Sequence, residues 1–398
     1  MLFMNATRQG LTPALVMLMS VATGLCVASN YYVQPLLNTI AQQFDLSVSL
    51  AGFIVTTAQL GYACGLLLLV PLGDRFERRS LIVTMILLAA AGMVIIALSH
   101  SFLFLLLGTV MTGLFSVAAQ ILVPLAATLA EPERRGKIVG TVMSGLLLGI
   151  LLARTVAGGL AQLGGWRTVY WTASLLMVIM ALALWRSLPR VKQSVPMSYP
   201  QLLASIFRLY AGNRVIRTRA WTGCLSFANF SLLWTSMAFL LSGAPYHFSE
   251  GKIGLLGLVG AAGALAARQA GSLADKGKAK LTTRLGLLLM LLSWAAIAWG
   301  AEQLVPLIVG ILLLDLAVQA VHITNQSVIY AQMPEARNRL NAGYMTSYFI
   351  GGAAGSLLSA TAYHLAGWYG VCIAGALLTL VNLLIWAGGS RFESEKIN

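Results

Sequence analysis

Four polar residues at helical spacing stand in an otherwise apolar stretch. Asp315, Gln319, His322 and Gln326 follow one another at steps of 4, 3 and 4 residues. At about 100° per residue, these steps place the four side chains on one face of a helix. Burial favours the neutral form of a carboxyl group, so an acid in a cavity of low dielectric takes up and releases a proton near neutral pH. An imidazole titrates in the same range. Asp315 and His322 are therefore candidates for a proton relay or a substrate anchor.

A structural role is the alternative for both titratable residues. Asp315 could pair with a neighbouring polar group, and His322 could be a hydrogen-bonded packing residue. Either way the polar face cannot meet lipid without cost, because hydrocarbon offers polar groups no partner. It must face protein or water.

Two arginines also lie inside apolar stretches, at Arg154 and Arg268. A charge at the centre of a bilayer costs about 2.5–3.5 kcal/mol on insertion scales. A favourable interaction must offset this cost. Either these arginines pair across an interface between helices, with a structural or gating role, or they bind an anionic group of a substrate.

The elements that carry these residues must cross a membrane. The 398-residue chain is 58% hydrophobic and 10% charged, whereas soluble domains carry about 25% charged residues. A membrane-spanning helix needs roughly 20 apolar residues, and the apolar runs predict an all-α membrane protein with twelve such helices. The predicted spans are residues 11–34, 50–72, 80–98, 102–129, 137–160, 168–187, 219–243, 252–274, 282–300, 304–331, 341–363 and 369–388.

The net charge of +14 does not indicate a nucleic-acid partner, because the basic residues sit in short loops between apolar segments. Of the 26 Lys and Arg residues, 22 fall on one side of the predicted spans, 2 on the other and 2 within spans. Cytoplasmic loops carry the excess of Lys and Arg. We therefore expect a multi-pass protein of the bacterial inner membrane with both termini in the cytoplasm.

An internal repeat divides the spans into two sets of six. Three pairs of segments recur at an offset of 202 residues: 44–52 with 246–254, 131–143 with 333–345, and 165–166 with 367–368. We expect an N-terminal half at 10–188, a cytoplasmic linker at 189–217 and a C-terminal half at 218–390. Two parallel halves with a substrate site between them near the midplane is one plan of secondary transporters.

Equivalent loops of the two halves place an acid beside several cations. The loops read GDRFERR at residues 73–79 and GSLADKGK at residues 271–278. Both resemble the signature loop of the major facilitator superfamily, and with the two-half plan the resemblance covers essentially the whole chain. It implies the twelve-helix fold of that family and alternating access. It also implies a gating role for four loop residues: Asp74, Arg75, Arg78 and Asp275. Val70 and Glu77 depart from the pattern, which has glycine at both places.

The fifth span is similar to that of the drug–proton antiporter and sugar-efflux branches, which implies proton-coupled efflux of a small organic molecule. Two departures weaken this implication. Ile150 replaces the proline that usually follows Gly149, and Thr109 stands where the fourth span often has arginine. In the family, spans 1, 4, 7 and 10 line the cavity. This adds further candidate cavity residues: Asn30, Gln34, Gln120 and Asn229, beside Gln319 and Gln326.

Other activities find little support in the sequence. It contains neither the G-x-x-x-x-G-K-[ST] pattern of a nucleotide-binding loop nor a His-Glu-x-x-His metal motif. We therefore expect no enzyme activity, cofactor or metal. The expected partners are a small-molecule substrate, protons and the lipid bilayer, and a monomer suffices. Proton-coupled uptake, facilitated diffusion of a metabolite and a non-transporting membrane receptor are the alternatives.

Overall fold

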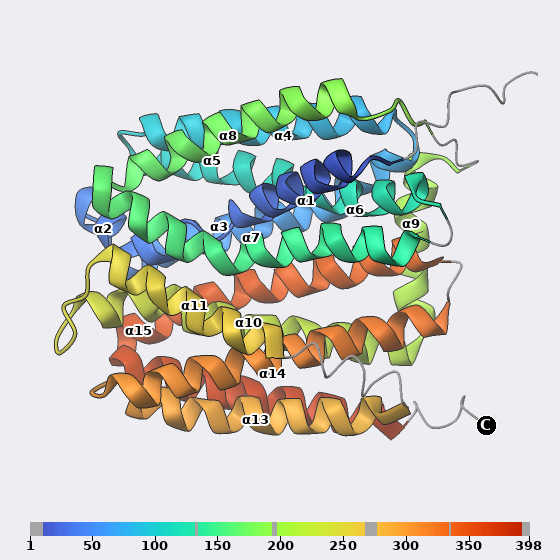
Figure 1. The fold of residues 1–398 in the computed structure, drawn as a ribbon. Helices are drawn as coiled ribbons and strands as arrows, with labels where there is room; N and C mark the ends of the chain where they lie inside the picture. Colours follow the sequence, from blue (N-terminus) through green and yellow to red (C-terminus); the bar gives the residue numbers. More distant parts are fainter. Residues whose placement is uncertain (1–10, 132–133, 193–196, 267–276, 334–335, 392–398) are drawn as a thin grey trace, which may run out of the picture.

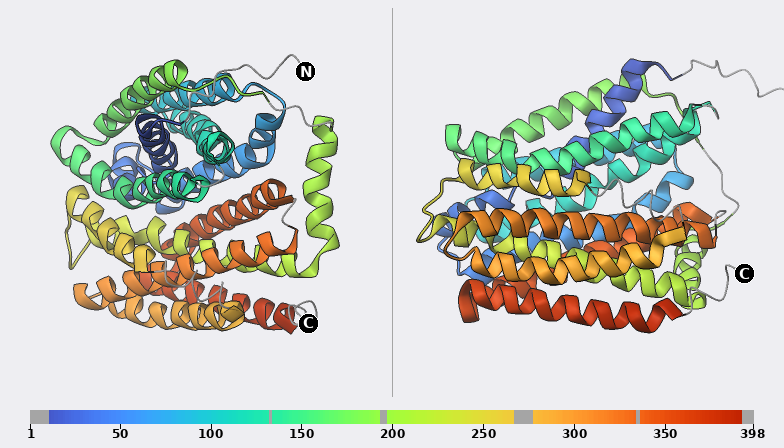
Figure 2. Two further views of the ribbon diagram at one scale, coloured as in Figure 1. Left: turned by 45° about the vertical axis from the view of Figure 1, so that its right-hand side comes forward. Right: turned by 60° about the horizontal axis from the view of Figure 1, so that its bottom comes forward.

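The computed structural model describes residues 11–131, 134–192, 197–266, 277–333 and 336–391. Within these ranges the regular structure is helical and contains no strand. Figures 1 and 2 show the helices lying side by side along roughly one direction, in two layers. The blue-to-green elements of the first half of the sequence form one layer, and the yellow-to-red elements form the other. The all-α fold is therefore confirmed for the described residues.

The first layer follows the first half of the chain. Its elements are α1 (Pro13–Ala28), η1 (Gln34–Leu36), α2 (Leu37–Gln43), α3 (Val48–Leu68), η2 (Val70–Asp74), α4 (Arg78–Leu98), α5 (Phe102–Phe115), η3 (Ser116–Ala118), α6 (Ala119–Leu129), α7 (Arg135–Gly164) and α8 (Trp166–Ser187). The second layer contains α10 (Arg214–Ser242), α11 (Glu250–Ala266), α13 (Ala279–Trp299), α14 (Leu304–Gln332) and α15 (Arg337–Ser390).

Nine helices of the described segments are long and apolar enough to cross a membrane. One of them, α15, has non-helical dihedral angles at Ala366 and Gly367, which divide its 54 residues into two helices. The apolar α1 has 16 residues and is continued by η1 and α2. The membrane-spanning character is thus confirmed, and the total of twelve crossings stays a prediction.

The backbone repeats at the offset found in the sequence. Asp45 and His247, 202 residues apart, both have positive φ angles, of 51° and 50°. Gly165 and Gly367 likewise have φ angles of 82° and 62°, at the breaks that precede a tryptophan in each half. Non-glycine residues rarely adopt positive φ, so the coincidence supports two related halves. The boundaries of those halves stay a prediction.

The predicted linker contains a helix that the sequence analysis missed. In α9 (Tyr199–Gly212), Ser198 and Gln201 form a capping box, a signal that the sequence does carry. The Tyr199 hydroxyl donates to the Leu68 carbonyl oxygen at 2.6 Å, and the Tyr210 hydroxyl donates to the Leu340 carbonyl oxygen at 2.6 Å. The helix therefore bridges the two layers (Figure 2, left). The next helix, α10, begins at Arg214, inside the expected linker, because Asn213 caps it.

The two layers pack closely at the end of the bundle where α7 finishes and α11 begins. A Cβ atom on Gly158 would lie 2.3 Å from the carbonyl oxygen of Glu250, and one on Gly254 would lie 2.6 Å from that of Arg154. The Thr155 hydroxyl donates to the Gly254 carbonyl oxygen at 2.9 Å. Small residues let helix backbones approach in lipid. This end of the bundle is closed by backbone-to-backbone packing.

Candidate functional site

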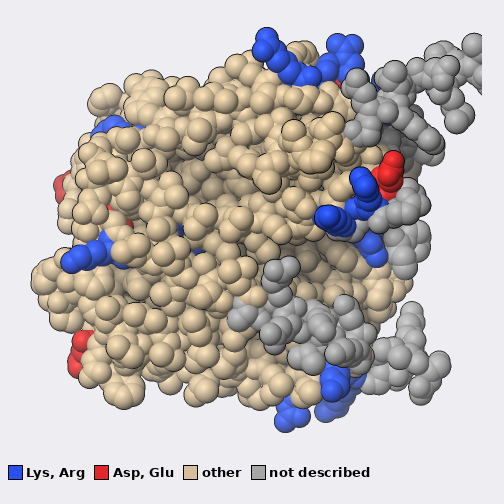
Figure 3. Space-filling view, viewed as in Figure 1, with Lys and Arg blue, Asp and Glu red and all other residues tan. Residues whose placement is uncertain are grey.

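A cavity of about 1130 Å³ lies between the two layers. At its inner end it is lined by Arg154 of α7 and Asp315 of α14. It extends to Arg135 and Arg337, the first residues of α7 and α15, at the end opposite the close packing of α7 on α11. Lys and Arg side chains gather mainly at this end, on the right of Figure 3, while the middle of the molecule is almost free of charge. The cavity is thus reached from the end that carries the basic loops.

An indole joins the two charged residues of the inner end. Trp234 of α10 donates its Nε1 hydrogen to Oδ1 of Asp315 at 3.3 Å. The ring of the same Trp234 lies 4.1 Å from the guanidinium carbon of Arg154. Both charged side chains are buried, with exposed fractions of 5% for Asp315 and 2% for Arg154. A cation, an aromatic ring and a carboxyl group therefore form one chain of contacts across the two layers.

Arg154 and Asp315, although close, form no direct ion pair among the described contacts. Arg154 donates its Nε hydrogen to Oε1 of Gln34 at 2.6 Å, and its Nη2 atom is buried with no hydrogen-bond partner in the segments that the structure describes. The rings of Tyr31 and Phe230 lie 5.0 and 5.1 Å from its guanidinium carbon. The arginine is held in a cage of aromatic rings, and one of its five N–H donors has a hydrogen-bond partner within the described part of the chain.

The polar stripe predicted on α14 faces the cavity. Asp315, Gln319, His322 and Gln326 all line it. His322 has its Nδ1 atom 3.0 Å from the hydroxyl oxygen of Tyr344, and its ring lies 4.5 Å from that of Tyr348. His322 is therefore hydrogen-bonded and packed, as the structural alternative expected, and it also borders the open space of the cavity. Its role in proton transfer stays a prediction.

The other predicted cavity residues divide into two groups. Gln120 lines the cavity, and its Nε2 atom donates to the hydroxyl of Tyr62 at 3.4 Å. Asn229 is not part of the described lining, and its role in the substrate cavity stays a prediction. Its Oδ1 atom accepts hydrogen bonds from Trp294 and Thr379, both at 2.9 Å. Asn229 therefore joins α10 to α13 and α15, because its side chain faces the interior of the second layer.

Asn30 and Gln34 are buried behind the cavity wall, and neither belongs to its described lining. Direct contact of Asn30 and Gln34 with substrate stays a prediction. Gln34 holds the guanidinium of Arg154. The amide nitrogen and oxygen of Asn30 are buried without a hydrogen-bond partner among the described residues.

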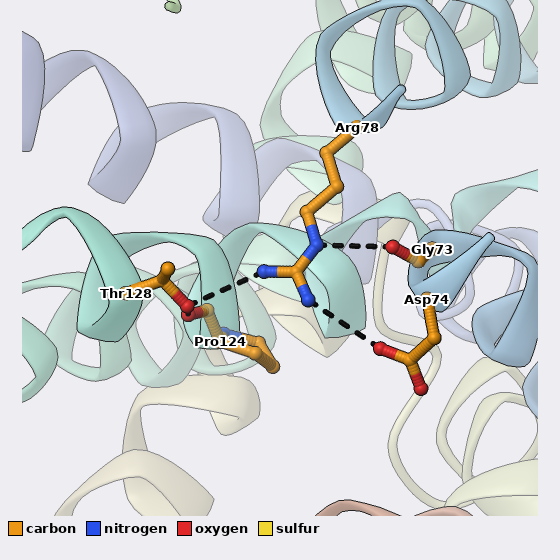
Figure 4. A network of polar contacts seen from close by, with 5 residues as sticks. All are labelled: Gly73, Asp74, Arg78, Pro124 and Thr128. Atoms are coloured by element: carbon orange, nitrogen blue, oxygen red, sulfur yellow. Dashed lines mark hydrogen bonds and ion pairs between the residues drawn. The ribbon is translucent and has the colours of Figure 1, made fainter. Parts of the chain in front are cut away.

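Of the predicted gating residues, Arg78 is central to a network inside the first layer (Figure 4). It donates to the Gly73 carbonyl oxygen at 3.0 Å, to Thr128 at 3.3 Å and to Oδ1 of Asp74 at 3.4 Å. Thr128 in turn donates to the Pro124 carbonyl oxygen at 2.9 Å. The network ties η2 and the first residue of α4 to α6. Arg75 is exposed, and Asp275 and Arg268 lie outside the described residues.

Glu77, which departs from the family pattern, caps α4. Its carboxylate accepts from the backbone N–H groups of Arg79 at 2.8 Å and Ser80 at 3.0 Å. Partial burial raises the pKa of Glu77, but the hydrogen bonds from Ser80 and Arg79 outweigh it and hold this pKa below its ordinary value. The residue replaces the glycine of the pattern with a helix cap.

Sequence reasoning missed Arg219, which it counted among the loop cations. The side chain is fully buried and donates to Thr283 at 2.6 Å and to Oδ1 of Asn325 at 3.0 Å. Asn213 caps α10 by accepting from Val215 and Ile216, so Arg219 already lies in the second turn. The capping residue Asn213 was the sequence signal that could have placed Arg219 inside the helix.

The chain is similar to known proteins over nearly its whole length. A sequence model of the Major Facilitator Superfamily matches residues 19–312 and 219–397. An uncharacterized transporter, YgaY of Escherichia coli O157:H7, is 67% identical over 386 residues, which are 97% of this chain and 98% of that protein. A chloramphenicol resistance protein of Streptomyces lividans is 26% identical over 395 residues, covering 92% of this chain and 94% of its own length.

Among solved structures, the fold is similar to that of a bacterial homologue of the human lysosomal transporter Spinster in an inward-facing and unoccupied conformation. The TM-score is 0.77 at 16% sequence identity, over 94% of this chain and 96% of that one. At this identity the likeness concerns the fold alone.

Proposed function

This chain belongs to the major facilitator superfamily, and we propose that it is a proton-coupled secondary transporter that moves a small organic molecule by alternating access. One observation carries the proposal. Asp315 is the one acidic residue in the described lining of the cavity, and it is buried at the inner end between the two layers. A single titratable acid at that place is suited to link protonation to the state of the carrier.

The coupling follows from the charges at the inner end. Arg154 belongs to the first layer, whereas Trp234 and Asp315 belong to the second. Protonation of Asp315 removes the negative charge that compensates Arg154, and so changes the interaction between the layers. A ligand shifts a conformational equilibrium by its different affinity for the two states. A proton that binds Asp315, at the contact between the layers, would shift the equilibrium between the two states of the carrier in the same way.

Alternating access requires each end of the bundle to open in turn. In the described state the cavity reaches the end with the basic loops, and Gly158 and Gly254 close the other end. The basic loops support a cytoplasmic location of the open end and of both termini. The network of Asp74 and Arg78 lies at this end and would engage the second layer when the cavity closes there. A monomer in the bacterial inner membrane is sufficient, and no enzyme activity is expected.

Export is the first candidate for the direction of transport. The name of the relative from Streptomyces lividans concerns resistance to chloramphenicol, which supports export of small organic molecules. Proton-coupled uptake is the second candidate, and the pair of Arg154 and Asp315 favours it for one kind of substrate. Protonation of Asp315 leaves Arg154 uncompensated, so a substrate anion and a proton would bind together and move in the same direction.

The proposal is tested by proton flux into liposomes that contain the purified protein. Chloramphenicol, sugars, amphipathic drugs and metabolites would be added in turn while the internal pH is followed. We expect at least one compound to trigger flux in the wild type and in Glu302→Gln, a control for an exposed acid, and none in Asp315→Asn. Full dependence of transport on the pH gradient in Asp315→Asn would refute the role of this acid.

A further inference from the structure

Arg154 has more hydrogen-bonding capacity than its surroundings use. A guanidinium carries five N–H donors, and Gln34 takes one of them, from Nε, as the sole described hydrogen-bond partner. Nη2 is buried and has no hydrogen-bond partner among the described residues. Two parallel N–H groups of an arginine match the two oxygens of a carboxylate or a phosphate. An anionic group is therefore the chemistry that completes this site.

Asp315 does not supply that anionic group in the described state. Its Oδ1 atom accepts the hydrogen bond from Trp234, and its Oδ2 atom is packed so close to α11 that a Cβ on Gly260 would lie 2.2 Å away. The indole of Trp234 occupies the space over the guanidinium of Arg154. The carboxyl group is thus fixed by its own neighbours, and the donors of the arginine remain for a ligand.

The charge of the cavity wall also favours an anion. Among the described lining residues, the charged side chains other than His322 are one acid, Asp315, and four arginines: Arg78, Arg135, Arg154 and Arg337. Arg78 is partly compensated by Asp74, but Arg135 and Arg337 stand at the mouth. A cleft lined mainly by one sign of charge raises the local concentration of the opposite ion. The mouth would attract an anion, and Arg154 would hold it.

Aromatic rings form much of the remaining wall next to Arg154. Phe227 and Tyr348 are stacked with ring centroids 4.1 Å apart and an interplanar angle of 15°. Phe230 stacks on Phe227 at 5.2 Å, and Phe349 lies 5.2 Å from Phe227 on another side. All four rings line the cavity. Aromatic pairs favour offset or edge contacts with a further ring, so this wall suits a ligand with an aromatic body.

We propose that the cavity binds an aromatic organic anion, with the carboxylate or phosphate on the guanidinium of Arg154 and the ring against Phe227, Phe230 and Tyr348. At about 1130 Å³ the cavity is slightly larger than the roughly 300–1,000 Å³ typical of ligand pockets, so it has room for a ligand larger than a single ring. The inference rests on the proposed transport function, since it names the substrate class of the same cavity.

Binding to the purified full-length protein tests the inference without transport. The probes are 2-naphthoate, its neutral amide 2-naphthamide, and 2-naphthyl phosphate, titrated by calorimetry. We expect the wild type to bind the carboxylate or the phosphate at least tenfold more tightly than the amide. The two anions distinguish which oxyanion the site prefers. Equal affinity for acid and amide, or no binding of either anion by folded protein, would overturn the inference.

Variants distinguish the contribution of Arg154 to binding from that of the rest of the cavity. Arg154→Gln is expected to lower affinity for the anion at least tenfold, to the level of the amide, and to leave affinity for the amide unchanged. Arg208→Gln, at an exposed position of α9, is the matched control and should bind as the wild type does. If Arg154→Gln does not fold, Arg154→Lys replaces it, with an intermediate loss expected because an ammonium lacks the planar pair of donors. An equal loss for acid and amide would contradict the role of Arg154.

Proton flux then distinguishes this inference from the transport proposal. Anion binding without proton flux would leave the site standing and refute coupling. Proton-coupled movement of neutral compounds that is unaffected in Arg154→Gln would refute the anion site and leave the transporter.

Discussion

Arg154 and Arg219 are two arginines buried in the same bundle, and their surroundings differ. Arg219 lies wholly within the second layer, where a hydroxyl of α13 and an amide oxygen of α14 accept its hydrogen bonds. Arg154 lies between the layers, borders the cavity and has one described hydrogen-bond partner and three aromatic neighbours. A charge within the membrane is therefore not by itself a sign of function. The unused donors and the open space beside Arg154 are what distinguish it.

The largest expected effect comes from removing each arginine in turn. Arg219→Leu leaves Thr283 and Asn325 buried without their donor, and each unsatisfied group costs about 1–3 kcal/mol. We expect a fall of several degrees in the thermal midpoint, measured by size-exclusion chromatography after heating in detergent. Arg154→Leu should lower transport strongly and lower the midpoint less than Arg219→Leu does, because one acceptor, Oε1 of Gln34, loses its donor instead of two. The comparison fails if the two variants lose stability to the same extent.

Gln34→Leu tests how the guanidinium of Arg154 is held in position. The change removes the acceptor that orients the guanidinium, and a hydrogen bond to a charged group contributes about 1.5–3 kcal/mol. We expect the apparent KM of transport to rise by about tenfold or more, together with a fall in the thermal midpoint from the lost hydrogen bond. An unchanged KM would show that the arginine is positioned by its aromatic neighbours alone.

Asn229→Leu tests the interior of the second layer, where Asn229 joins α10 to α13 and α15. Two hydrogen bonds, from Trp294 and Thr379, lose their acceptor, at a cost of about 1–3 kcal/mol for each unsatisfied group. We expect a lower thermal midpoint and normal transport per folded molecule. A specific loss of substrate binding would instead return Asn229 to the cavity.

The smallest effect is expected at Glu77, a charge outside the spans. Its pKa is lower in the folded protein than in an unfolded chain. Its contribution to stability is therefore present above the ordinary glutamate pKa of about 4.3 and is lost as the pH falls through the lowered value. Glu77→Gln should lower the thermal midpoint slightly at pH 7, and the difference from the wild type should shrink in acid. A difference that grows in acid would contradict the capping role.

The sequence predicted the polar face of α14, because helical spacing alone places Asp315 and His322 on one side. It did not predict which neighbour each buried polar group would meet. Asn229 and Gln34 turn toward other helices, and their spacing carries no information about those contacts. Arg219, the first residue of the predicted seventh span, was counted with the cations of the preceding loop, although helix α10 begins at Arg214. Helix α9 was missed because its 14 residues are too few to cross a membrane and because the surrounding stretch, residues 186–219, is rich in basic residues and proline.

The most direct test of the central claim compares gradient-driven accumulation with exchange in liposomes, for a compound that the wild type moves. The account predicts that the wild type accumulates or expels the compound according to an imposed pH gradient. Asp315→Asn should still exchange the compound across the membrane without a gradient, and should no longer concentrate it when the gradient is applied. Concentration by Asp315→Asn to the level of the wild type would contradict the account, because the cavity would then be coupled through another group.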